Sequence, residues 1–269
     1  RKLQEFHAEK NMPATISIYP NIDKYTKNNI FVEDGIVKEY DAERKGERLN
    51  GVDIGFFVLS KDLVQEMTDG NFSFQRDFLT KLIERKELSG FITNYPYASI
   101  GKVGRISDTE RYLKDRKVVF LDRDGTINVR PGKANYVASW GDFKFLPGVI
   151  DAIRLLTENG YEIYVITNQS GVARGVMTED DLAVINKNMT DELRKSGAVI
   201  NGIYACIHGW DSACDCRKPK AGLFVKAARE NLLNLANAVF IGDDERDLQA
   251  GQNAGITTYL IDDKNGLLD

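Results

Sequence analysis

The sequence predicts an α/β protein in which a smaller mixed α/β domain precedes a doubly wound parallel sheet. Between residues 117 and 261, short apolar runs alternate with stretches of helical spacing, which is typical of parallel strands joined by crossover helices. Residues 1–113 lack this regular alternation, and a length of 269 residues suits two domains. We therefore expect one domain at residues 1–113 and another at 114–269.

The C-terminal domain should contain strands and helices in strict alternation. They are a strand at 117–121, a helix at 147–160, a strand at 161–166, a long helix after Thr178, a strand at 202–205, a helix at 222–233, a strand at 238–241, a helix at 245–253 and a strand at 257–261. Thr178 suits an N-cap, and the acids that follow it favour the positive end of the helix dipole. Because ligands of such sheets bind beyond the carboxyl ends of the strands, the residues at those ends are candidates for function.

The N-terminal domain shows shorter and less regular patterns. Residues 14–19 predict a strand, and residues 30–40 predict two short strands around an Asp34-Gly35 turn. Residues 51–60 form a long apolar run, and residues 72–85 have helical spacing. The polar and basic segment 110–117 is expected to link the two domains near residue 114.

Composition narrows the classes of partner. The net charge of −4 provides no basic field for nucleic acid or an anionic membrane surface. No apolar run approaches the ~20 residues of a membrane span, and no signal peptide is visible. The 3 cysteines are an odd number in one cluster, which argues against a disulfide framework and for a reduced compartment. We expect a cytoplasmic protein that acts on a small molecule.

Two acids directly follow the first strand of the C-terminal domain. Residues two apart in an extended chain point the same way, so Asp122 and Asp124 should project together, and Gly125 permits a sharp exit from the strand. Two carboxylates this close repel each other unless a cation or a shared proton intervenes. One could be an ionised nucleophile while the other transfers a proton. A turn capped by Asp and Gly, without a function, is the alternative.

Polar residues also follow the second strand, in the segment Thr167-Asn168-Gln169-Ser170-Gly171. A hydroxyl and backbone N–H groups at a glycine-containing turn suit a phosphate oxygen, although a plain polar loop is the alternative. The basic segment 217–220 precedes a predicted helix, where cations can neutralise a transferring phosphoryl group. A solvated run of charges is the alternative for this segment.

The strand at 238–241 leads into Asp243, Asp244 and Asp247. A buried strand that ends in three acids is costly without a cation, and a helix N-cap accounts for only one of them. Mg²⁺ prefers a few carboxylates together with water and a phosphate oxygen. Asp122, Asp243 and a backbone carbonyl near Asp124 could provide such a site.

These four segments resemble motifs I to IV of the haloacid dehalogenase superfamily. The resemblance implies a Rossmann-like core without a large cap domain. It also implies that Asp122 is the nucleophile and that Asp124 is the general acid and base. Thr167 and Lys218 would hold the phosphoryl group, and Mg²⁺ would be bound by Asp122, Asp243 and the backbone of Asp124.

A second metal site is predicted between the third strand and the basic segment. All three cysteines and one of the two histidines form the pattern C-x-H-x5-C-x-C. The predicted ligands are Cys206, His208, Cys214 and Cys216. Three thiolates and one imidazole complete a tetrahedral zinc set and leave no open position, so this zinc should be structural. A buried cluster of free thiols or an adventitious disulfide is the alternative.

The motifs also narrow the resemblance within the superfamily, over residues 117–262. LDRDGTIN, TNQSGVARG, the cysteine cluster and CRKPKAG are similar to phosphatases of heptose bisphosphates and to the related histidinol-phosphate phosphatases. This resemblance implies that Arg217 helps to recognise substrate and that the loop from Arg130 to Tyr136 lies beside the sugar. The expected substrate-binding residues are Asn168, Gln169, Ser170, Arg217 and Arg130.

The N-terminal domain resembles the C-terminal half of a sugar-1-phosphate nucleotidyltransferase. The segments that carry this resemblance are GVDIGFFVLS, FSFQRDFLTKLI and PYASIGKVGR. The resemblance implies either nucleotidyl transfer or a retained scaffold or dimerisation module. A chain that starts partway through such a domain should expose apolar surface at residues 14–19 and 51–60, which would favour a homo-oligomer.

Three functions remain open from the sequence. The first is Mg²⁺-dependent hydrolysis of the 7-phosphate of a heptose bisphosphate, through an aspartyl-phosphate, in the synthesis of nucleotide-activated heptose. The second keeps this chemistry but acts on histidinol phosphate or another small phosphate ester. The third is a sugar-nucleotide-binding or assembly module with little turnover.

Overall fold

The computed structural model describes residues 2–21, 24–67, 71–93, 98, 100–132, 135–262 and 266–267. The chain divides into two compact units, Arg1–Tyr97 and Ala98–Asp269. The predicted boundary between residues 113 and 114 falls inside the second unit, at the end of α4 (Ile106–Leu113). In the segment PYASIGKVGR, residues 96, 97 and 99 lie outside the described residues. Each unit is described by itself.

The C-terminal unit contains a parallel sheet of five strands in the order β10-β9-β6-β7-β8. The strands are β6 (Val118–Leu121), β7 (Glu162–Asn168), β8 (Gly202–Cys206), β9 (Ala238–Gly242) and β10 (Thr257–Leu260). All four residues of β6 are buried, as expected for a central strand that is covered on both faces. The predicted parallel sheet is confirmed, and β7 runs two residues beyond the predicted end at 166, so it includes Thr167 and Asn168.

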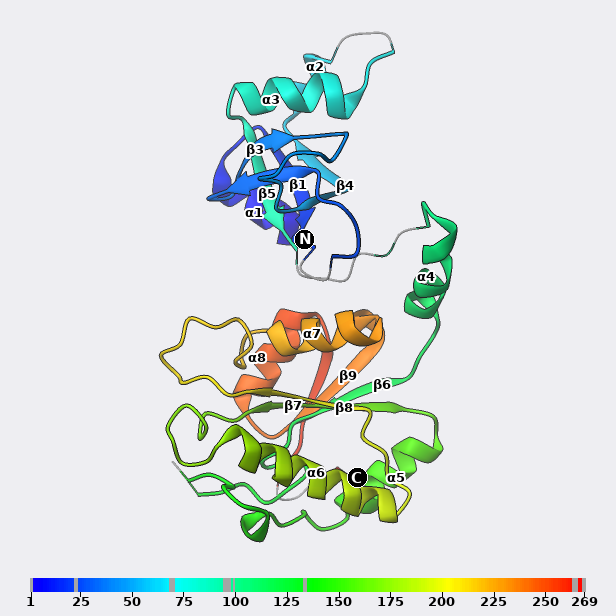
Figure 1. The fold of residues 1–269 in the computed structure, drawn as a ribbon, viewed down its shortest axis with the longest axis vertical. Coiled ribbons are helices and arrows are strands. Elements are labelled where there is room, and N and C mark those ends of the chain that lie inside the picture. Colours follow the sequence, from blue (N-terminus) through cyan, green and yellow to red (C-terminus); the bar gives the residue numbers. More distant parts are fainter. Residues whose placement is uncertain are drawn as a thin grey trace. The chain divides into compact units, whose positions relative to one another are not determined.

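Helices cover both faces of this sheet, α5 and α6 on one and α7 and α8 on the other (Figure 1). Their bounds are α5 (Val149–Glu158), α6 (Glu179–Lys195), α7 (Gly222–Asn231) and α8 (Glu245–Ala254). Thr178 begins α6 as predicted, in a capping box with Asp181. The predicted end of α7 at residue 233 is wrong, because Leu232 adopts a left-handed conformation with φ 53° and so ends the helix.

The core beneath α7 and α8 is built on aromatic rings. Phe224 of α7 lies edge-on to Phe120 of β6 and Phe240 of β9, with centroid distances of 5.1 and 4.9 Å. All three side chains are fully buried. Edge-to-face packing adds to the stabilisation from burial itself, so Phe224 should be a main anchor of α7 on the sheet.

Phe224→Ala is expected to lower the free energy of unfolding of this unit by ~3–5 kcal/mol, because it leaves a cavity between α7 and the sheet. Both tryptophans, Trp140 and Trp210, belong to the C-terminal unit, so urea titration followed by tryptophan fluorescence reports on that unit alone. The control is Leu155→Ala on the exposed side of α5. Equal losses for the two variants would contradict the assignment of Phe224 to the core.

The N-terminal unit has a mixed five-stranded sheet in the order β2-β3-β5-β1-β4. The strands are β1 (Ala14–Tyr19), β2 (Ile30–Glu33), β3 (Ile36–Tyr40), β4 (Val52–Leu59) and β5 (Leu88–Ile92). The predicted hairpin is confirmed, since Asp34 and Gly35 both have positive φ, at 51° and 75°, between β2 and β3.

Short helices flank this sheet, with α2 and α3 on one side and α1 on the other (Figure 1). Their bounds are α1 (Lys2–Lys10), α2 (Lys61–Gln65) and α3 (Thr80–Glu84). The predicted helix at 72–85 is present, but it starts as a π-helix at Phe74–Leu79 before it continues as α3. None of the helices among the described residues is long and apolar enough to cross a membrane.

The expected exposure of apolar surface at residues 14–19 is wrong. All six residues of β1 are buried, because β4 pairs with one edge, β5 pairs with the other, and helices cover both faces. The expectation holds in part for residues 51–60, because β4 is an edge strand and Phe56 is 66% exposed.

Candidate active site

A cleft of about 900 Å³ lies beyond the carboxyl ends of β6 and β7. Asp122 directly follows β6, and Thr167 is the last residue but one of β7; both line this cleft. The parallel sheet therefore brings together residues that are far apart in the sequence, as expected for a fold of this class. The predicted residues Asp124, Asn168, Ser170, Arg130, Arg217 and Lys218 line the same cleft.

The turn after β6, which contains Asp122 and Asp124, lies close to the end of β9. The Asp122 backbone N–H donates to the Ile241 carbonyl at 2.9 Å. Gly125 has φ 97°, and a Cβ at this position would lie 1.9 Å from Oδ2 of Asp243. The turn thus needs glycine both for its conformation and for its close approach to Asp243.

Gly125→Ala is expected to reduce the predicted phosphatase activity by ~100-fold, because its methyl group displaces the Asp243 carboxylate from its position opposite Asp122. Gly160→Ala is the matched control. Gly160 has a similar positive φ of 77°, but a Cβ there would meet nothing within 4 Å. Similar kcat values for the two variants would show that Asp243 needs no fixed position.

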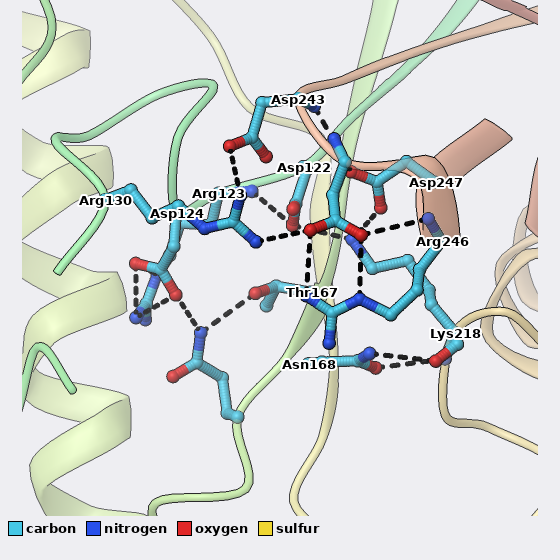
Figure 2. Close-up of polar contacts among 12 residues, drawn as sticks. Asp122, Arg123, Asp124, Arg130, Thr167, Asn168, Lys218, Asp243, Arg246 and Asp247 are labelled. Carbon is cyan, nitrogen blue, oxygen red and sulfur yellow. Dashed lines mark hydrogen bonds and ion pairs between the residues drawn. The ribbon is translucent and has the colours of Figure 1, made fainter. Parts of the chain in front are cut away.

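Lys218 lies between two buried carboxylates, as Figure 2 shows. Its Nζ is 2.8 Å from Oδ1 of Asp122 and 2.6 Å from Oδ1 of Asp247. Burial raises the pKa of Asp122 to about 7 against the opposing charge of Lys218. Burial alone would lower the pKa of Lys218, but the two carboxylates raise it, so its ammonium charge is retained. The cluster places a fixed positive charge beside the Asp122 carboxylate.

Asn168 fixes the backbone that carries Lys218. The Lys218 N–H donates to Asn168 Oδ1 at 3.0 Å, and Asn168 Nδ2 donates to the Lys218 carbonyl at 3.1 Å. Asn168 was expected to contact substrate; it lines the cleft, and its amide holds the lysine segment. No sequence pattern indicates that an amide at the end of a strand, such as that of Asn168, binds the backbone of a distant loop.

The Asp124 carboxylate is held by three neighbouring side chains, of which Figure 2 labels Arg123. Gln169 Nε2 donates to Oδ2 at 2.6 Å, and Asn128 Nδ2 donates to Oδ1 at 2.9 Å. Arg123, which is fully buried, donates from Nη2 to both oxygens at 3.1 Å. Gln169, expected to contact substrate, is buried and also donates to the Thr167 hydroxyl at 2.9 Å. These bonds orient Asp124 at the edge of the cleft.

Three carboxylates converge where a cation is expected. Asp122, Asp243 and Asp247 offer oxygens that all lie within 4.8 Å of one another. Asp243 Oδ1 is buried and has no hydrogen-bond partner among the described residues. Burial, the largest cause, raises the pKa of Asp243 despite the nearby Arg130. A divalent cation fits this donor set, because it would satisfy the orphaned oxygen and offset the clustered charge.

Of the predicted magnesium ligands, the carboxylates of Asp122 and Asp243 are brought together. The predicted contribution of Asp124 is its backbone carbonyl, and its side chain points to Arg123 and Gln169. Asp247 had no assigned role in the sequence reading. It accepts from the N–H groups of Asp243 and Asp244 at 3.2 Å while it also pairs with Lys218. The sequence feature that could have indicated a role for Asp247 is its place as the third acid after the strand. That place also fits the N3 position of a capping box.

Arg130 bridges two of the acids after β9. Its Nη1 lies 3.0 Å from Asp243 Oδ2, and its Nη2 lies 2.7 Å from Asp244 Oδ2. Asp244 also accepts from Arg246 Nε at 2.8 Å, and hydrogen bonds from Arg246 hold the pKa of Asp244 well below its usual range. Asp244 therefore organises two arginines along one wall of the cleft.

The predicted zinc ligands converge at the end of β8. Cys206, His208, Cys214 and Cys216 offer atoms within 4.8 Å of one another. His208 Nδ1 lies 3.1 Å from Cys216 Sγ, which lies 3.2 Å from Cys206 Sγ. Burial and the two neighbouring thiols raise the pKa of Cys216 to about 12. Thiolates this crowded need a cation, and three sulfurs with one imidazole fit zinc.

Comparison with known proteins gives consistent relatives for the C-terminal unit. Residues 117–256 match the family model described as polynucleotide kinase 3 phosphatase. The chain is 40% identical over 151 residues to D-glycero-beta-D-manno-heptose-1,7-bisphosphate 7-phosphatase of Haemophilus influenzae, covering 54% of this chain and 80% of that protein. It is 41% identical over 145 residues to D-glycero-alpha-D-manno-heptose-1,7-bisphosphate 7-phosphatase of Campylobacter jejuni, covering 54% and 81%.

A solved structure agrees with these relatives. It is D,D-heptose 1.7-bisphosphate phosphatase from B. bronchiseptica, complexed with magnesium and phosphate. It superposes with a TM-score of 0.52 at 37% identity, covering 56% of this chain and 83% of that one. The matched region of this chain contains all the residues of the cleft described above.

Proposed function

The chain belongs to the haloacid dehalogenase-type phosphatases, in the family of the heptose-1,7-bisphosphate 7-phosphatases that it matches, and from this premise we propose that it removes the 7-phosphate of D-glycero-D-manno-heptose 1,7-bisphosphate. The observation that supports this proposal most strongly is the buried Lys218 between Asp122 and Asp247. The cluster gives the cleft a carboxylate nucleophile with a fixed cation beside it. Two carboxylates without that cation would repel a phosphate dianion.

Asp122 acts as the nucleophile in the proposed mechanism. One of its oxygens forms a bond to phosphorus as the bond from phosphorus to the sugar oxygen breaks, which yields an aspartyl-phosphate on this residue. Lys218 and the Thr167 hydroxyl hold the phosphoryl oxygens during the transfer. Asp122 and Asp243, with the Asp124 carbonyl, would hold Mg²⁺, which when bound screens the repulsion between carboxylate and phosphate.

Asp124 moves the protons in both steps. It donates a proton to the leaving sugar oxygen and then accepts one from the water that attacks the aspartyl-phosphate, which releases phosphate and restores Asp122. The contacts from Gln169, Asn128 and Arg123 keep its carboxylate oriented for both tasks. Water is consumed once for each turnover, so no further reactant is needed.

The zinc cluster has a structural role in this proposal. Zinc held by all four side chains would have no position left for substrate. Because Arg217 and Lys218 directly follow the ligand Cys216, the metal would fix the segment that carries both cations. Thiolate ligands are kept reduced in the cytoplasm, so we place the enzyme there, which cell fractionation would test.

We propose two functional domains, residues 1–113 and the phosphatase domain at residues 114–269. The N-terminal domain would be a nucleotidyltransferase-like scaffold that supports a homo-oligomer. The proposal is supported by the exposed Phe56 on the edge strand β4. Sedimentation equilibrium tests it with Phe56→Lys, which should shift an oligomer towards monomer. A wild-type chain that stays monomeric at high concentration would overturn this part alone.

Substrate identity is tested by phosphate release in the presence of Mg²⁺. The compounds compared are the α and β anomers of D-glycero-D-manno-heptose 1,7-bisphosphate and histidinol phosphate. We expect one heptose anomer to have the highest kcat/KM, since relatives named for either anomer match this chain about equally well. Turnover of histidinol phosphate alone would overturn the heptose assignment while it left the phosphatase chemistry standing.

A further inference from the structure

Gln169 joins two residues of the proposed reaction centre from behind the wall of the cleft. Its side chain is 1% exposed, whereas Asp124 and Thr167 both line the cleft. One nitrogen, Nε2, donates to Oδ2 of Asp124 at 2.6 Å and to the Thr167 hydroxyl oxygen at 2.9 Å. An amide nitrogen carries two hydrogens, so each neighbour receives one of them. A single buried amide therefore connects the two residues.

The neighbours of Gln169 decide which end of its amide faces them. Asp124 also accepts from Arg123 Nη2 at 3.1 Å and from Asn128 Nδ2 at 2.9 Å. A carboxylate that balances a buried guanidinium can only accept hydrogen bonds, so Asp124 requires the amide nitrogen of Gln169 and excludes its oxygen. The second hydrogen on that nitrogen points to Thr167, and the hydroxyl oxygen of Thr167 must therefore act as an acceptor.

The backbone of Gln169 is fixed as well. Gln169 directly follows β7, and its N–H donates at 2.7 Å to the carbonyl of Cys206, the last residue of β8. The two strands are paired up to Asn168 and Cys206, so the bond from Gln169 extends their ladder by one residue. The amide is thus held in place before substrate binds, which lowers the cost of orienting it in the reaction.

The Thr167 hydroxyl keeps one hydrogen to donate. A hydroxyl group has one hydrogen and two lone pairs, and Gln169 occupies one of the lone pairs. Among the residues that the structure describes, no carbonyl or carboxylate accepts the hydrogen of this hydroxyl. The side of the oxygen that faces Gln169 is closed to that hydrogen. A phosphoryl oxygen bound in the cleft would therefore be its acceptor.

We propose that Gln169 is a positioning residue that makes the Thr167 hydroxyl a hydrogen-bond donor to the transferring phosphoryl group. This inference rests on the proposed function, in which Thr167 holds a phosphoryl oxygen, and it replaces the expected contact of Gln169 with substrate. Without Gln169, the hydroxyl is free to turn its hydrogen away from the cleft. A preorganised donor contributes most where negative charge develops in the transition state, so the effect should appear mainly in kcat.

A double-mutant cycle on the Mg²⁺- and Zn²⁺-loaded enzyme tests this role. The substrate is p-nitrophenyl phosphate, whose leaving group is a weak base and needs little help from a proton on Asp124. Gln169→Met, which has a similar volume but no donor, should lower kcat ~10–100-fold and change KM less than about threefold. In a Thr167→Val background, the same substitution should lower kcat by roughly a fifth of that factor or less, because no hydroxyl remains to be directed. Gln249→Met, exposed on α8, is the control and should leave kcat unchanged.

The cycle separates a positioning role from a structural one. A packing defect or a loss of folded enzyme would lower kcat by the same factor in both backgrounds, and that result would overturn the inference. Wild-type kcat in Gln169→Met would overturn it too. If Gln169→Met does not fold, Gln169→Glu enters the same cycle, since it keeps the shape of the side chain. Its carboxylate would accept the Thr167 hydrogen, so we expect a larger loss that again shrinks without the hydroxyl.

The outcomes also distinguish this inference from the proposed function. Hydrolysis of p-nitrophenyl phosphate without hydrolysis of a heptose bisphosphate would overturn the sugar assignment, and the cycle would still decide the role of Gln169. If the wild-type enzyme hydrolyses only the heptose bisphosphate, the cycle is carried out with that substrate. Hydrolysis of neither compound would overturn the proposed function and this inference together.

Discussion

Asp122→Asn is expected to abolish phosphate release, with a loss of at least about 10⁴-fold in kcat, as when a nucleophile is removed from other enzymes with covalent intermediates. An amide has no anionic oxygen to attack phosphorus, and the neighbouring Asp124 is turned towards Arg123 and Gln169. No other carboxylate in the described part of the cleft combines burial with direct contact to Lys218 except Asp247, which is 1% exposed and already caps α8.

The fold should survive this substitution. Asparagine keeps an oxygen for the Lys218 ammonium, and it removes a buried carboxyl whose pKa burial raises to about 7. The melting temperature should therefore move by no more than ~4 °C, which corresponds to about 1 kcal/mol in a domain of this size. Asp180→Asn, exposed in the first turn of α6, is the control. Activity above one hundredth of wild type, in protein free of wild-type contamination, would rule out Asp122 as the nucleophile.

Cys214→Ser is expected to remove bound zinc and to lower kcat/KM by ~10–100-fold, the range seen when residues that support a site are lost. We expect this loss because the zinc ligands lie next to Lys218 in the chain: the ligand pattern ends at Cys216, and Lys218 lies two residues further along. Without the metal, the segment loses a constraint at one end, while Asn168 still holds its other end through two hydrogen bonds. Misplacement of Lys218 by about 1 Å would suffice for a loss of this size.

Metal analysis and kinetics on the same samples provide the measurement. Wild type should contain about one zinc per chain, as four ligands complete one tetrahedral site, and Cys214→Ser should contain much less. Asp215→Asn is the matched control, because Asp215 lies between two ligands but its side chain is 89% exposed. After chelation, Mg²⁺ alone should not restore activity, whereas Zn²⁺ with Mg²⁺ should. Loss of zinc with full activity in Cys214→Ser would remove the link between the two sites.

Features that depend on residue type and on geometry within one short segment can be predicted from the sequence. Asp122 and Asp124 follow a continuous apolar run, and the alternation of side chains along a strand is enough to place both at its end. The cysteine cluster could be predicted equally well, because the spacing of its ligands is short and one loop is enough to bring the four side chains together. The Asp34-Gly35 hairpin belongs to the same class, since both residues tolerate positive φ.

Contacts between distant segments could not be predicted in this way. Asn168 and Lys218 are fifty residues apart, and only the packed sheet shows that the amide binds the lysine backbone. Asp247 looked like one of several acids at a helix start until its second oxygen was found on Lys218. The predicted exposure of β1 was wrong for the same reason, since the burial of this strand depends on strand partners that local patterns do not specify.

The order of strands across the C-terminal sheet has a consequence for protein synthesis. β6 carries the nucleophile and is made first, but its neighbour on one side is β9, which starts at residue 238. Until β9 has left the ribosome, Asp243 and Asp247 are not available, and Asp122 has neither its full set of acids nor an ordered Lys218. We therefore expect no hydrolysis of phosphate esters by a nascent chain before β9 and the start of α8 have joined the sheet.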